Sequence, residues 1–348
     1  MLQHPEATRT PVRGDHTGIL AGDIAPAVHD LQRSTTPTRV FEGWSEDHTA
    51  LWGRHPIKLQ HTLHKSPLFS MDGLAELIDA YPREFYMLVY MGAQNDKKFW
   101  REGDIAGMPG KDVINAIAQG RLWLNLRRTN DVDSRYGRIL DQMFDEIGAK
   151  IGNRDGFDTR SFGILISSPG AQVYYHCDLP NQSLWQVAGR KRVFVYPNKA
   201  PFLRGEDLER IATFEVEVDI PYDGWYDKYA QVYDLEPGEM LHWPLNSPHR
   251  VVNYDVLNVS ITTEYWAREA LMGHRLNVAN GAMRYRMGYK PKSRAVAGPG
   301  FLAKGVMVRG LSRTRWFRKV KRIHKPIDFK LDAARPGQII DLPVAQAQ

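Results

Sequence analysis

The chain of 348 residues contains one cysteine, Cys177. A disulfide within the chain is therefore excluded, and a reducing cytoplasm is the expected compartment. No run of about 18 apolar residues is present, so we expect no membrane span. The first residues, MLQHPEATRTPVRGDHTG, are polar and lack the apolar segment of a secretory signal. No internal repeat of fixed period is found.

The net charge of +6 is unevenly distributed. Residues 284–348 hold 16 lysines and arginines against three acids, a balance of +13. The remaining residues hold 30 basic and 37 acidic side chains, a balance of −7. The basic character therefore belongs to a C-terminal segment and not to the whole protein.

The first half of the chain reads as an arm followed by helices. Residues 1–40 are polar and proline-containing, which predicts a loosely held N-terminal arm. Residues 41–159 predict a helical and mixed region: helices over 70–82, 111–120 and 134–151, and a buried strand over 83–92. Ser70 is the expected N-cap of the first helix, and Pro82 its end.

From residue 160 to 268 the sequence pattern changes to that of short strands separated by Gly, Pro, Asn and Asp. This spacing is typical of a β-barrel or sandwich. Residues 269–348 predict a C-terminal extension, with a helix over 266–288, a Gly/Pro-rich linker over 289–305 and then the basic tail. We therefore expect an α+β protein with a mainly β core at 160–268. The expected strands are SFGILISS, QVYYHC, SLWQVAG, KRVFVYP, TFEVEVDI, AQVYDLEPG, EMLHWP, HRVVNY and LNVSITTEYW.

A metal site is suggested by His176-Cys177-Asp178. With 12 histidines and 40 acids in 348 residues, chance gives about 1.4 His-x-acid pairs, and the chain has two. The other pair begins at His4 in the presumed arm. In a strand, residues i and i+2 face the same side, so His176 and Asp178 can aim an imidazole and a carboxylate into a barrel interior.

A third ligand must come from another strand. His249 begins the strand that follows LEPGEMLHWPLNSP, and His242 competes with it from within the preceding strand. Two imidazoles and one carboxylate on one face of an octahedral ion leave three positions open, as in non-haem Fe(II) oxygenases. The competing interpretation is a hydrogen-bonded pair of His176 and Asp178 with no metal.

Three ordered elements resemble the JmjC-type, cupin-like 2-oxoglutarate oxygenases, and most closely their protein-hydroxylase branch. The family has His-x-Asp on a strand, then a strand ending in Gly-x-Lys and an apolar stretch with Tyr-Pro. Its distal histidine follows a Pro-Gly-acid turn, a strand and a proline loop. The matching residues here are His176-Cys177-Asp178, LWQVAGRK ending at Lys191, VFVYP ending at Pro197, Pro237-Gly238-Glu239 and His249.

The resemblance implies a double-stranded β-helix of the jelly-roll type, binding Fe(II), 2-oxoglutarate and O2. It implies His176, Asp178 and His249 as metal ligands and Lys191 as partner of the 5-carboxylate of 2-oxoglutarate. Tyr174 should share the face of His176 and reach the same carboxylate. The family often has a polar residue near the co-substrate at the position of Asn181 or Gln182, and Gln182 is nearer the usual offset. Two positions depart from the family: Val173 replaces a threonine, and Glu264 stands where some relatives carry an amide.

Two functional classes follow. The first is an Fe(II)/2-oxoglutarate dioxygenase that hydroxylates a peptide or protein side chain or a small metabolite. The second is a non-catalytic cupin that binds a metal or another ligand. The basic segment RGLSRTRWFRKVKRIHK, residues 309–325, has two interpretations in either class: a solvated helix face with a flexible end, or a contact for an anionic partner or a second copy of the chain.

Overall fold

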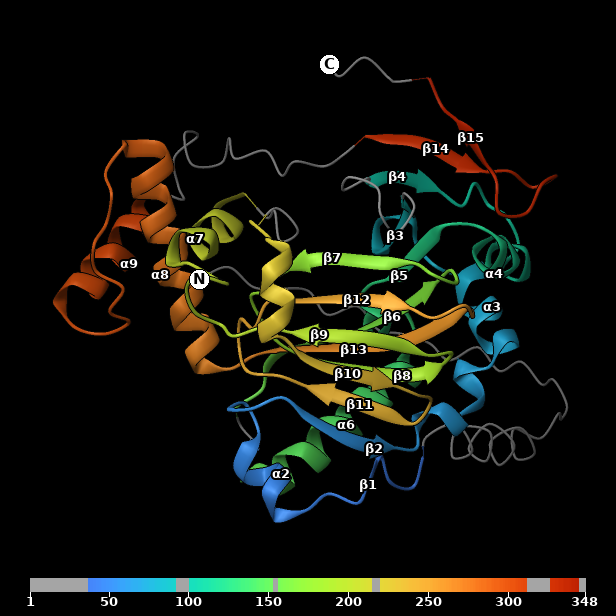
Figure 1. The fold of residues 1–348 in the computed structure, drawn as a ribbon, viewed down its shortest axis with the longest axis horizontal. Helices are drawn as coiled ribbons and strands as arrows, with labels where there is room; N and C mark the ends of the chain where they lie inside the picture. Colours follow the sequence, from blue (N-terminus) through green and yellow to red (C-terminus); the bar gives the residue numbers. More distant parts are fainter. Residues whose placement is uncertain (1–36, 92–99, 153–155, 215–219, 312–325, 344–348) are drawn as a thin grey trace, which may run out of the picture.

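The computed structural model describes residues 37–91, 100–152, 156–214, 220–311 and 326–343. Two β-sheets lie face to face, and helices cover the larger sheet and cap one end of the molecule (Figure 1). Within the described residues this is the mixed, mainly β architecture that the strand pattern predicts.

The larger sheet runs through both halves of the chain. Its neighbouring strands are antiparallel except for β4 and β14, which are parallel. Five of its strands come from residues before 130, so the N-terminal region extends the sheet as well as packing on it. In spatial order the strands are β1 (Phe41–Glu42), β2 (Ile57–His61), β11 (Glu239–His242), β8 (Asn181–Ala188), β13 (Asn258–Trp266), β6 (Asp158–Ser167), β5 (Leu122–Leu126), β3 (Tyr86–Met91), β4 (Trp100–Asp104), β14 (Ile327–Leu331) and β15 (Ile339–Asp341).

The smaller sheet has the order β10 (Gln231–Leu235), β9 (Lys191–Val195), β12 (His249–Asn253) and β7 (Gln172–His176). From β6 to β13 the chain passes repeatedly between the sheets: β6, β8, β11 and β13 belong to the larger one, and β7, β9, β10 and β12 to the smaller. Eight of the nine strands expected between 160 and 268 are therefore present.

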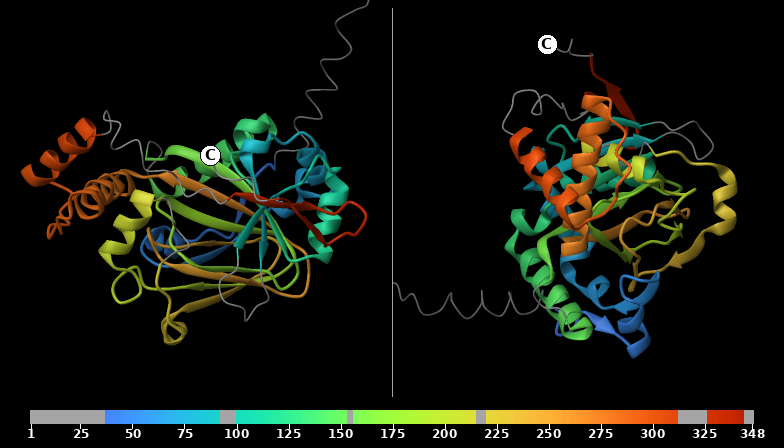
Figure 2. Two further views of the ribbon diagram at one scale, coloured as in Figure 1. Left: turned by 90° about the horizontal axis from the view of Figure 1, so that it is seen from above. Right: turned by 90° about the vertical axis from the view of Figure 1, so that its left-hand side faces the viewer.

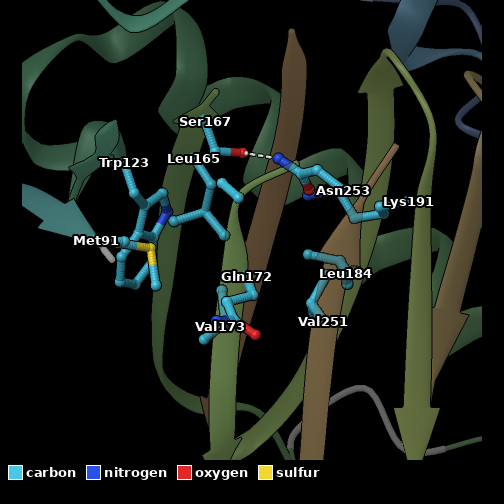
Figure 3. A pocket seen from close by; sticks show the side chains of 11 residues that line it. Met91, Trp123, Leu165, Ser167, Gln172, Val173, Leu184, Lys191, Val251 and Asn253 are labelled. Carbon is cyan, nitrogen blue, oxygen red and sulfur yellow. Dashed lines mark hydrogen bonds between the residues drawn. The ribbon is translucent and has the colours of Figure 1, made fainter. Parts of the chain in front are cut away.

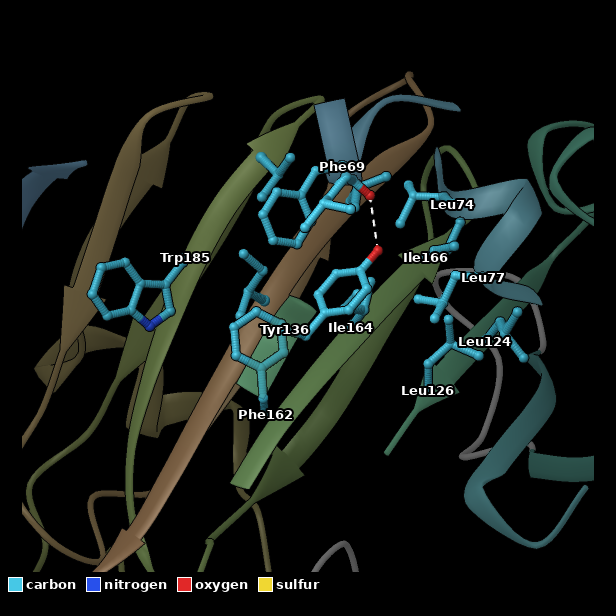
Figure 4. Packing of buried hydrophobic residues seen from close by; sticks show 14 of the residues in the cluster. Phe69, Leu74, Leu77, Leu124, Leu126, Tyr136, Phe162, Ile164, Ile166 and Trp185 are labelled. Carbon is cyan, nitrogen blue, oxygen red and sulfur yellow. Dashed lines mark hydrogen bonds between the residues drawn. The ribbon is translucent and has the colours of Figure 1, made fainter. Parts of the chain in front are cut away.

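Strand alternation divides the side chains between two cores. On β8, Trp185 joins the core beneath the helices, whereas Leu184 lies between the two sheets with Val193 of β9 and Val251 of β12. Figure 4 shows the helix-side core, where Tyr136 of helix α6 (Ser134–Ile151) donates a hydrogen bond to the carbonyl of Leu68. Because successive side chains of a strand point to opposite faces, one face of the larger sheet packs against the helices and the other lines the space between the two sheets.

The helices predicted in the first half are confirmed. They are α3 (Met71–Asp79), α4 (Gly110–Gln119) and α6 (Ser134–Ile151), with the short α2 (Glu46–Leu51) and α5 (Thr129–Val132). The hydroxyl of Ser70 accepts a hydrogen bond from the amide of Gly73, which confirms the predicted N-cap. The strand expected over 83–92 begins at Tyr86, after one 3-10 turn over Arg83–Phe85.

Three predictions about the remaining elements are wrong. Thr213 and Phe214 of the expected strand TFEVEVDI end helix α7 (Gly205–Phe214); residues 215–219 lie outside the described part of the chain. The expected linker over 289–305 contains the start of α9 (Pro299–Leu311), because proline is well accommodated at the start of a helix. The C-terminal extension is not only helical, since it returns as β14 and β15 to extend the larger sheet.

Helices α7, α8 (Arg268–Met287) and α9 gather at one end of the molecule, as all views show (Figures 1 and 2). Glu209 of α7 is 1% exposed and accepts hydrogen bonds from Asn280 and Arg284 of α8 and from Arg294. This buried carboxylate holds α7 against α8 and the segment that follows. Residues 312–325 of the basic tail and the arm up to residue 36 lie outside the described residues. No helix in the described ranges is long and apolar enough to cross a membrane.

The pairing of the C-terminal strand β14 with β4 can be tested at Phe329, which is fully buried against Gly103 of β4. We expect Phe329→Ala to lower the free energy of unfolding by about 3 kcal/mol, because it removes a buried ring and leaves a cavity. Ile327→Ala, on the same strand but 40% exposed, should change it by less than about 1 kcal/mol. Urea unfolding of both variants makes the measurement, and equal effects would contradict a docked β14.

Candidate metal centre and adjoining cavity

The two histidines of the candidate centre face each other across neighbouring strands. His176 is the last residue of β7 and His249 the first of β12, and their Cα atoms are direct partners in the antiparallel ladder. Their ring centroids are 4.1 Å apart. Both side chains lie between the sheets, since Tyr175, which follows the opposite alternation on β7, packs in a separate cluster with Tyr196 and Phe202.

Backbone hydrogen bonds fix how each imidazole is presented. Nδ1 of His176 lies 2.8 Å from the carbonyl oxygen of Tyr174, and Nδ1 of His249 lies 3.1 Å from that of Ser247. A carbonyl only accepts, so each Nδ1 carries the proton and donates it. In its neutral form a ring held in this way directs the lone pair of Nε2 at the space between the two histidines, which is the form that binds a metal.

Asp178 completes the cluster from just beyond the end of β7. One of its carboxylate oxygens lies 3.3 Å from Nε2 of His249, and the other 4.0 Å from Nε2 of His176. The structure thus brings His176, Asp178 and His249 together, with one ligand atom of each within 4.8 Å of the others. The side chain of Asn246 donates to the main-chain carbonyl of Asp178 at 2.9 Å and so positions the turn.

The electrostatics of this cluster are unfavourable without a cation. Oδ2 of Asp178 is buried and has no hydrogen-bond partner. Burial raises the pKa of the Asp178 carboxyl, an effect that the neighbouring His176 opposes. Burial also holds the pKa of His249 well below its usual value, and His176 lowers it further. A divalent ion would satisfy the orphaned carboxylate and both lone pairs at once, so the residues fit a metal.

His242 does not join this cluster. It is fully buried on β11 and stacks on Trp52 with ring centroids 3.8 Å apart, on the helix-side face of the larger sheet. Its Nδ1 lies 2.9 Å from the hydroxyl of Ser183. Burial lowers the pKa of His242 to about 3, so it is a neutral structural side chain. Of the two candidates for the third ligand, the tertiary structure places His249 at the centre.

A cavity lies between the sheets (Figure 3). Val251 lies two residues beyond His249 on β12 and lines this cavity, as does Val173 of β7. The other apolar lining residues are Met91, Trp123, Leu165, Ala171 and Leu184, and the polar ones are Ser167, Gln172, Lys191 and Asn253. The cavity is therefore lined mainly by apolar side chains, and Val251 brings its wall to within two residues of His249 along β12.

Lys191 of β9 is the one basic residue among those that line the cavity. It is 3% exposed and has no hydrogen bond or ion pair with any other described residue. Burial lowers its pKa to about 7. Its Cα partner on β12, Asn253, instead donates to the hydroxyl of Ser167 at 2.8 Å. A cationic side chain held in a cavity without an anionic partner points to an anionic ligand, which would supply the missing charge.

The other predicted site residues occupy different faces. Tyr174 packs against the cluster of Val89, Met91 and Trp123, and the last two of these line the cavity. Gln182 of β8 is the Cα partner of Glu264 on the inner face. Asn181 is the partner of Tyr265 and so faces the helix-side core. The roles of Tyr174, Gln182 and Asn181 at a co-substrate remain predictions.

Supporting residues were missed by the sequence reasoning. Asn246 and Ser247 hold Asp178 and His249 in place, and Ser167 and Asn253 sit beside Lys191. The first pair carries a sequence signal, because both belong to the PLNSP loop directly before His249. The second pair carries none, since the residues are 86 positions apart and meet only through pairing of distant strands.

Comparison with known proteins gives low similarity throughout. No family model and no curated protein matches the chain. Among solved structures, it is similar to YcfD, a ribosomal oxygenase from Escherichia coli, described in complex with cobalt and 2-oxoglutarate. That likeness has 16% identity, a TM-score of 0.44 and coverage of 84% of this chain and 74% of the other. A second structure of YcfD, with cobalt and succinic acid, has 16% identity, a TM-score of 0.43 and the same coverage. Because these values are low, the function is derived below from the residues of the centre.

The centre can be tested by metal binding alone. We expect His249→Ala to weaken binding of Mn(II), a redox-stable probe, by more than about 100-fold, since loss of even an outer partner of a ligand typically costs 10- to 100-fold. His242→Gln should leave the affinity unchanged, because that ring lies on the other face of the sheet. Calorimetric titration of Mn(II) measures both, and weakening by the His242 change would contradict the assignment.

Proposed function

We propose that this chain is an Fe(II)- and 2-oxoglutarate-dependent oxygenase. The observation that carries the proposal is the combination of two features: a cluster of two imidazoles and one carboxylate, and, farther along β12, a cavity lined by a buried lysine that has no partner among the described residues. The cluster suits a divalent metal that keeps open coordination positions. The buried lysine suits an anionic co-substrate.

The dimensions support a dicarboxylate between metal and lysine. Asn253 lies beside Lys191 and four residues from His249 along β12, a separation of about 13 Å at the rise of an extended strand. A five-carbon dicarboxylate is shorter than this, and the long stem of the lysine covers the difference. The 1-carboxylate and 2-keto groups would then take two metal positions, and the 5-carboxylate would pair with Lys191.

The passage of the chain between the sheets supports the proposed fold family. Apart from β9 and β10, which are neighbours in the smaller sheet, successive strands from β6 to β13 alternate between two stacked sheets, as in a jelly roll or double-stranded β-helix. In this interpretation the metal centre lies between the sheets, where the inner faces of both can contribute ligands.

Each residue has a defined task. Bound iron, with 2-oxoglutarate and O2, would supply the oxidising chemistry that yields succinate and CO2. His176, Asp178 and His249 bind the metal and leave three positions open. Lys191 anchors and orients the co-substrate. The apolar walls at Leu184 and Val251 exclude water from the space between them.

The substrate is proposed to present a C–H bond for hydroxylation at the remaining face of the metal. A peptide or protein side chain, or a small metabolite, is consistent with the centre, because specificity in such folds resides in the surrounding loops and helices. The alternative is a metal- or ligand-binding cupin without turnover, which has the same centre.

Turnover distinguishes these two functions. Purified protein with Fe(II), ascorbate and air should convert 2-oxoglutarate to succinate slowly even without a substrate, and His176→Ala should abolish this conversion. Cys177→Ala changes the neighbouring residue, which packs on the opposite side with Tyr175, and should retain at least half of the rate. Quantifying succinate by mass spectrometry makes the test. Persistent turnover in the His176 variant would rule out the proposed ligands, whereas metal binding without turnover would support the cupin alternative.

Replacement of Lys191 by methionine should separate binding from stability. Unfolded lysine keeps its proton up to its ordinary pKa of 10.5, whereas the native residue loses it near 7. The native state therefore binds fewer protons between these values, and stability rises with pH across that window. We expect Lys191→Met to abolish 2-oxoglutarate binding and to raise the free energy of unfolding by at least about 1 kcal/mol near pH 6, with a smaller gain near pH 9.5.

Calorimetry on the Mn(II) protein and urea unfolding at the two pH values measure these effects. Lys199→Met removes an exposed lysine and should change neither binding nor stability. A Lys191 variant that is less stable at both pH values and binds 2-oxoglutarate normally would contradict the role.

A further inference from the structure

Helix α9 has an apolar face that no other described element covers. Leu302 is 68% exposed and Val306 is 74% exposed. These two residues are four positions apart and Arg309 follows three positions later, so all three side chains lie on one face of the helix. The opposite face packs on α8, and its Lys304 donates a hydrogen bond to the carbonyl of Ser293. Exposed aliphatic side chains that adjoin one another, unlike scattered ones, mark an interaction surface.

The end of α8 and the segment that leads to α9 expose further apolar side chains. Met287, Tyr289 and Val296 are 47%, 60% and 40% exposed. Gly300 and Gly305 of α9 have no packed neighbour within 4 Å of the place where a Cβ would stand. Helix α9 lies outermost at this end of the molecule (Figures 1 and 2). We call the exposed side chains of this end the α8–α9 surface: Met287, Tyr289, Lys290, Lys292, Val296, Leu302, Val306 and Arg309.

The α8–α9 surface belongs to the most basic part of the chain. Residues 284–311 contain seven lysines and arginines and no acid. Two of the seven pair with Glu209 of α7, whereas Lys290 and Lys292 are exposed. Residues 312–325, which lie outside the described part of the chain, add seven more lysines and arginines and again no acid. Positive charge is therefore concentrated at the end of the molecule that exposes apolar side chains.

This combination of charge and apolar exposure distinguishes between possible partners. A symmetric contact with a second copy would bring two basic surfaces together, with no acid from residues 284–311 to pair with them. Nucleic acid would pair with the lysines, but its phosphate backbone offers no apolar surface to Leu302 and Val306. An anionic bilayer offers both: headgroup phosphates for lysine and arginine, and an acyl boundary for aliphatic side chains. Tyrosine is also enriched at the level between the two.

We propose that the α8–α9 surface binds the surface of an anionic lipid bilayer. Leu302 and Val306 enter the boundary between headgroups and acyl chains, and Lys290, Lys292 and Arg309 lie among the headgroups. Helix α9 has 13 residues, fewer than the roughly 20 that a membrane span needs, so the contact is peripheral. The inference goes beyond the proposed oxygenase function and does not depend on the metal centre.

Vesicle flotation of the full chain tests the proposal. One set of vesicles contains phosphatidylcholine alone, and the other contains equal parts of phosphatidylcholine and phosphatidylglycerol. The protein should bind the anionic vesicles at least about tenfold more tightly, because each lysine or arginine near an anionic surface adds to the affinity. Added sodium chloride should weaken this binding by screening the charges. Equal binding to both sets, or binding to neither, would overturn the proposal.

An apolar pair of substitutions tests the face of α9. Leu302→Ser combined with Val306→Ser should weaken binding to the anionic vesicles by at least about tenfold, because two aliphatic side chains no longer enter the acyl boundary. The matched control combines Leu51→Ser with Val232→Ser, which removes two exposed apolar side chains elsewhere and should preserve binding. Equal losses in the two double variants would show general stickiness and sink the assignment.

A charged pair of substitutions tests the headgroup contact. Lys290→Glu combined with Lys292→Glu should also weaken binding by at least about tenfold, and should reduce its dependence on salt. The control, Lys150→Glu combined with Lys199→Glu, makes the same charge change at exposed positions outside the surface and should bind more tightly than the test variant. Equal binding by the two variants would mean that only net charge matters, against the proposal.

Two further measurements separate folding and other partners from lipid binding. Urea unfolding of each variant should give the wild-type midpoint, so that a lost interaction is not a lost fold. Sedimentation velocity reports self-association: if the Leu302 and Val306 changes dissociate a dimer but leave flotation unchanged, the surface is a contact between copies. Titration with a fluorescent RNA oligonucleotide reports nucleic acid: RNA binding without vesicle binding would replace the proposed partner. Either result would overturn the proposal, whereas loss of flotation by both test variants at an unchanged midpoint supports it.

Discussion

The register between β7 and β12 is the constraint on which the site depends. It sets His249 directly opposite His176, and both imidazoles project between the two sheets. A shift of one residue would turn one of them to the outer face and separate the pair, because side chains alternate along a strand. The bonds from Nδ1 to main-chain carbonyls then hold each ring with its lone pair inward. The strand register and the hydrogen bonds of Nδ1 therefore position both imidazoles without a bound metal.

The same interior holds charges that the fold itself does not neutralise. Asp178 has an orphaned oxygen, Lys191 has no anionic partner, and Glu264 has no donor among the described residues. A core built only for stability would pair or omit such groups, since each is costly when buried. Asp178 belongs to the candidate metal cluster, and Lys191 lines the mainly apolar cavity between the sheets. These unpaired charges lower the stability of the folded protein, and the proposed ligands would offset that cost by pairing with them.

Elements with a strong local pattern were predictable from the sequence, and those fixed by distant contacts were not. The helix over Met71–Asp79 carries its own cap at Ser70, and the strands around Trp185 and Val193 carry alternating or apolar runs bounded by turns. Strand β14 is short, and it pairs with β4 more than 200 residues earlier in the chain, so nothing local marks its place. Helix α7 gains its stability from the ion pairs of Glu209 with α8 and Arg294, which only the tertiary arrangement brings together.

The sequence by itself determined the chemical types and their order: a His-x-Asp pair, a lysine 13 residues later and a histidine after a proline loop. It could not decide between His242 and His249, or between Asn181 and Gln182, because each choice depends on which face of a strand points inward. The tertiary structure places His249, and not His242, beside His176, and it places Gln182 and Asn181 on opposite faces of β8. It alone revealed that Lys191 lines a cavity between the sheets. Local sequence specifies donor atoms, whereas their convergence requires the strand register and sheet packing of the folded chain.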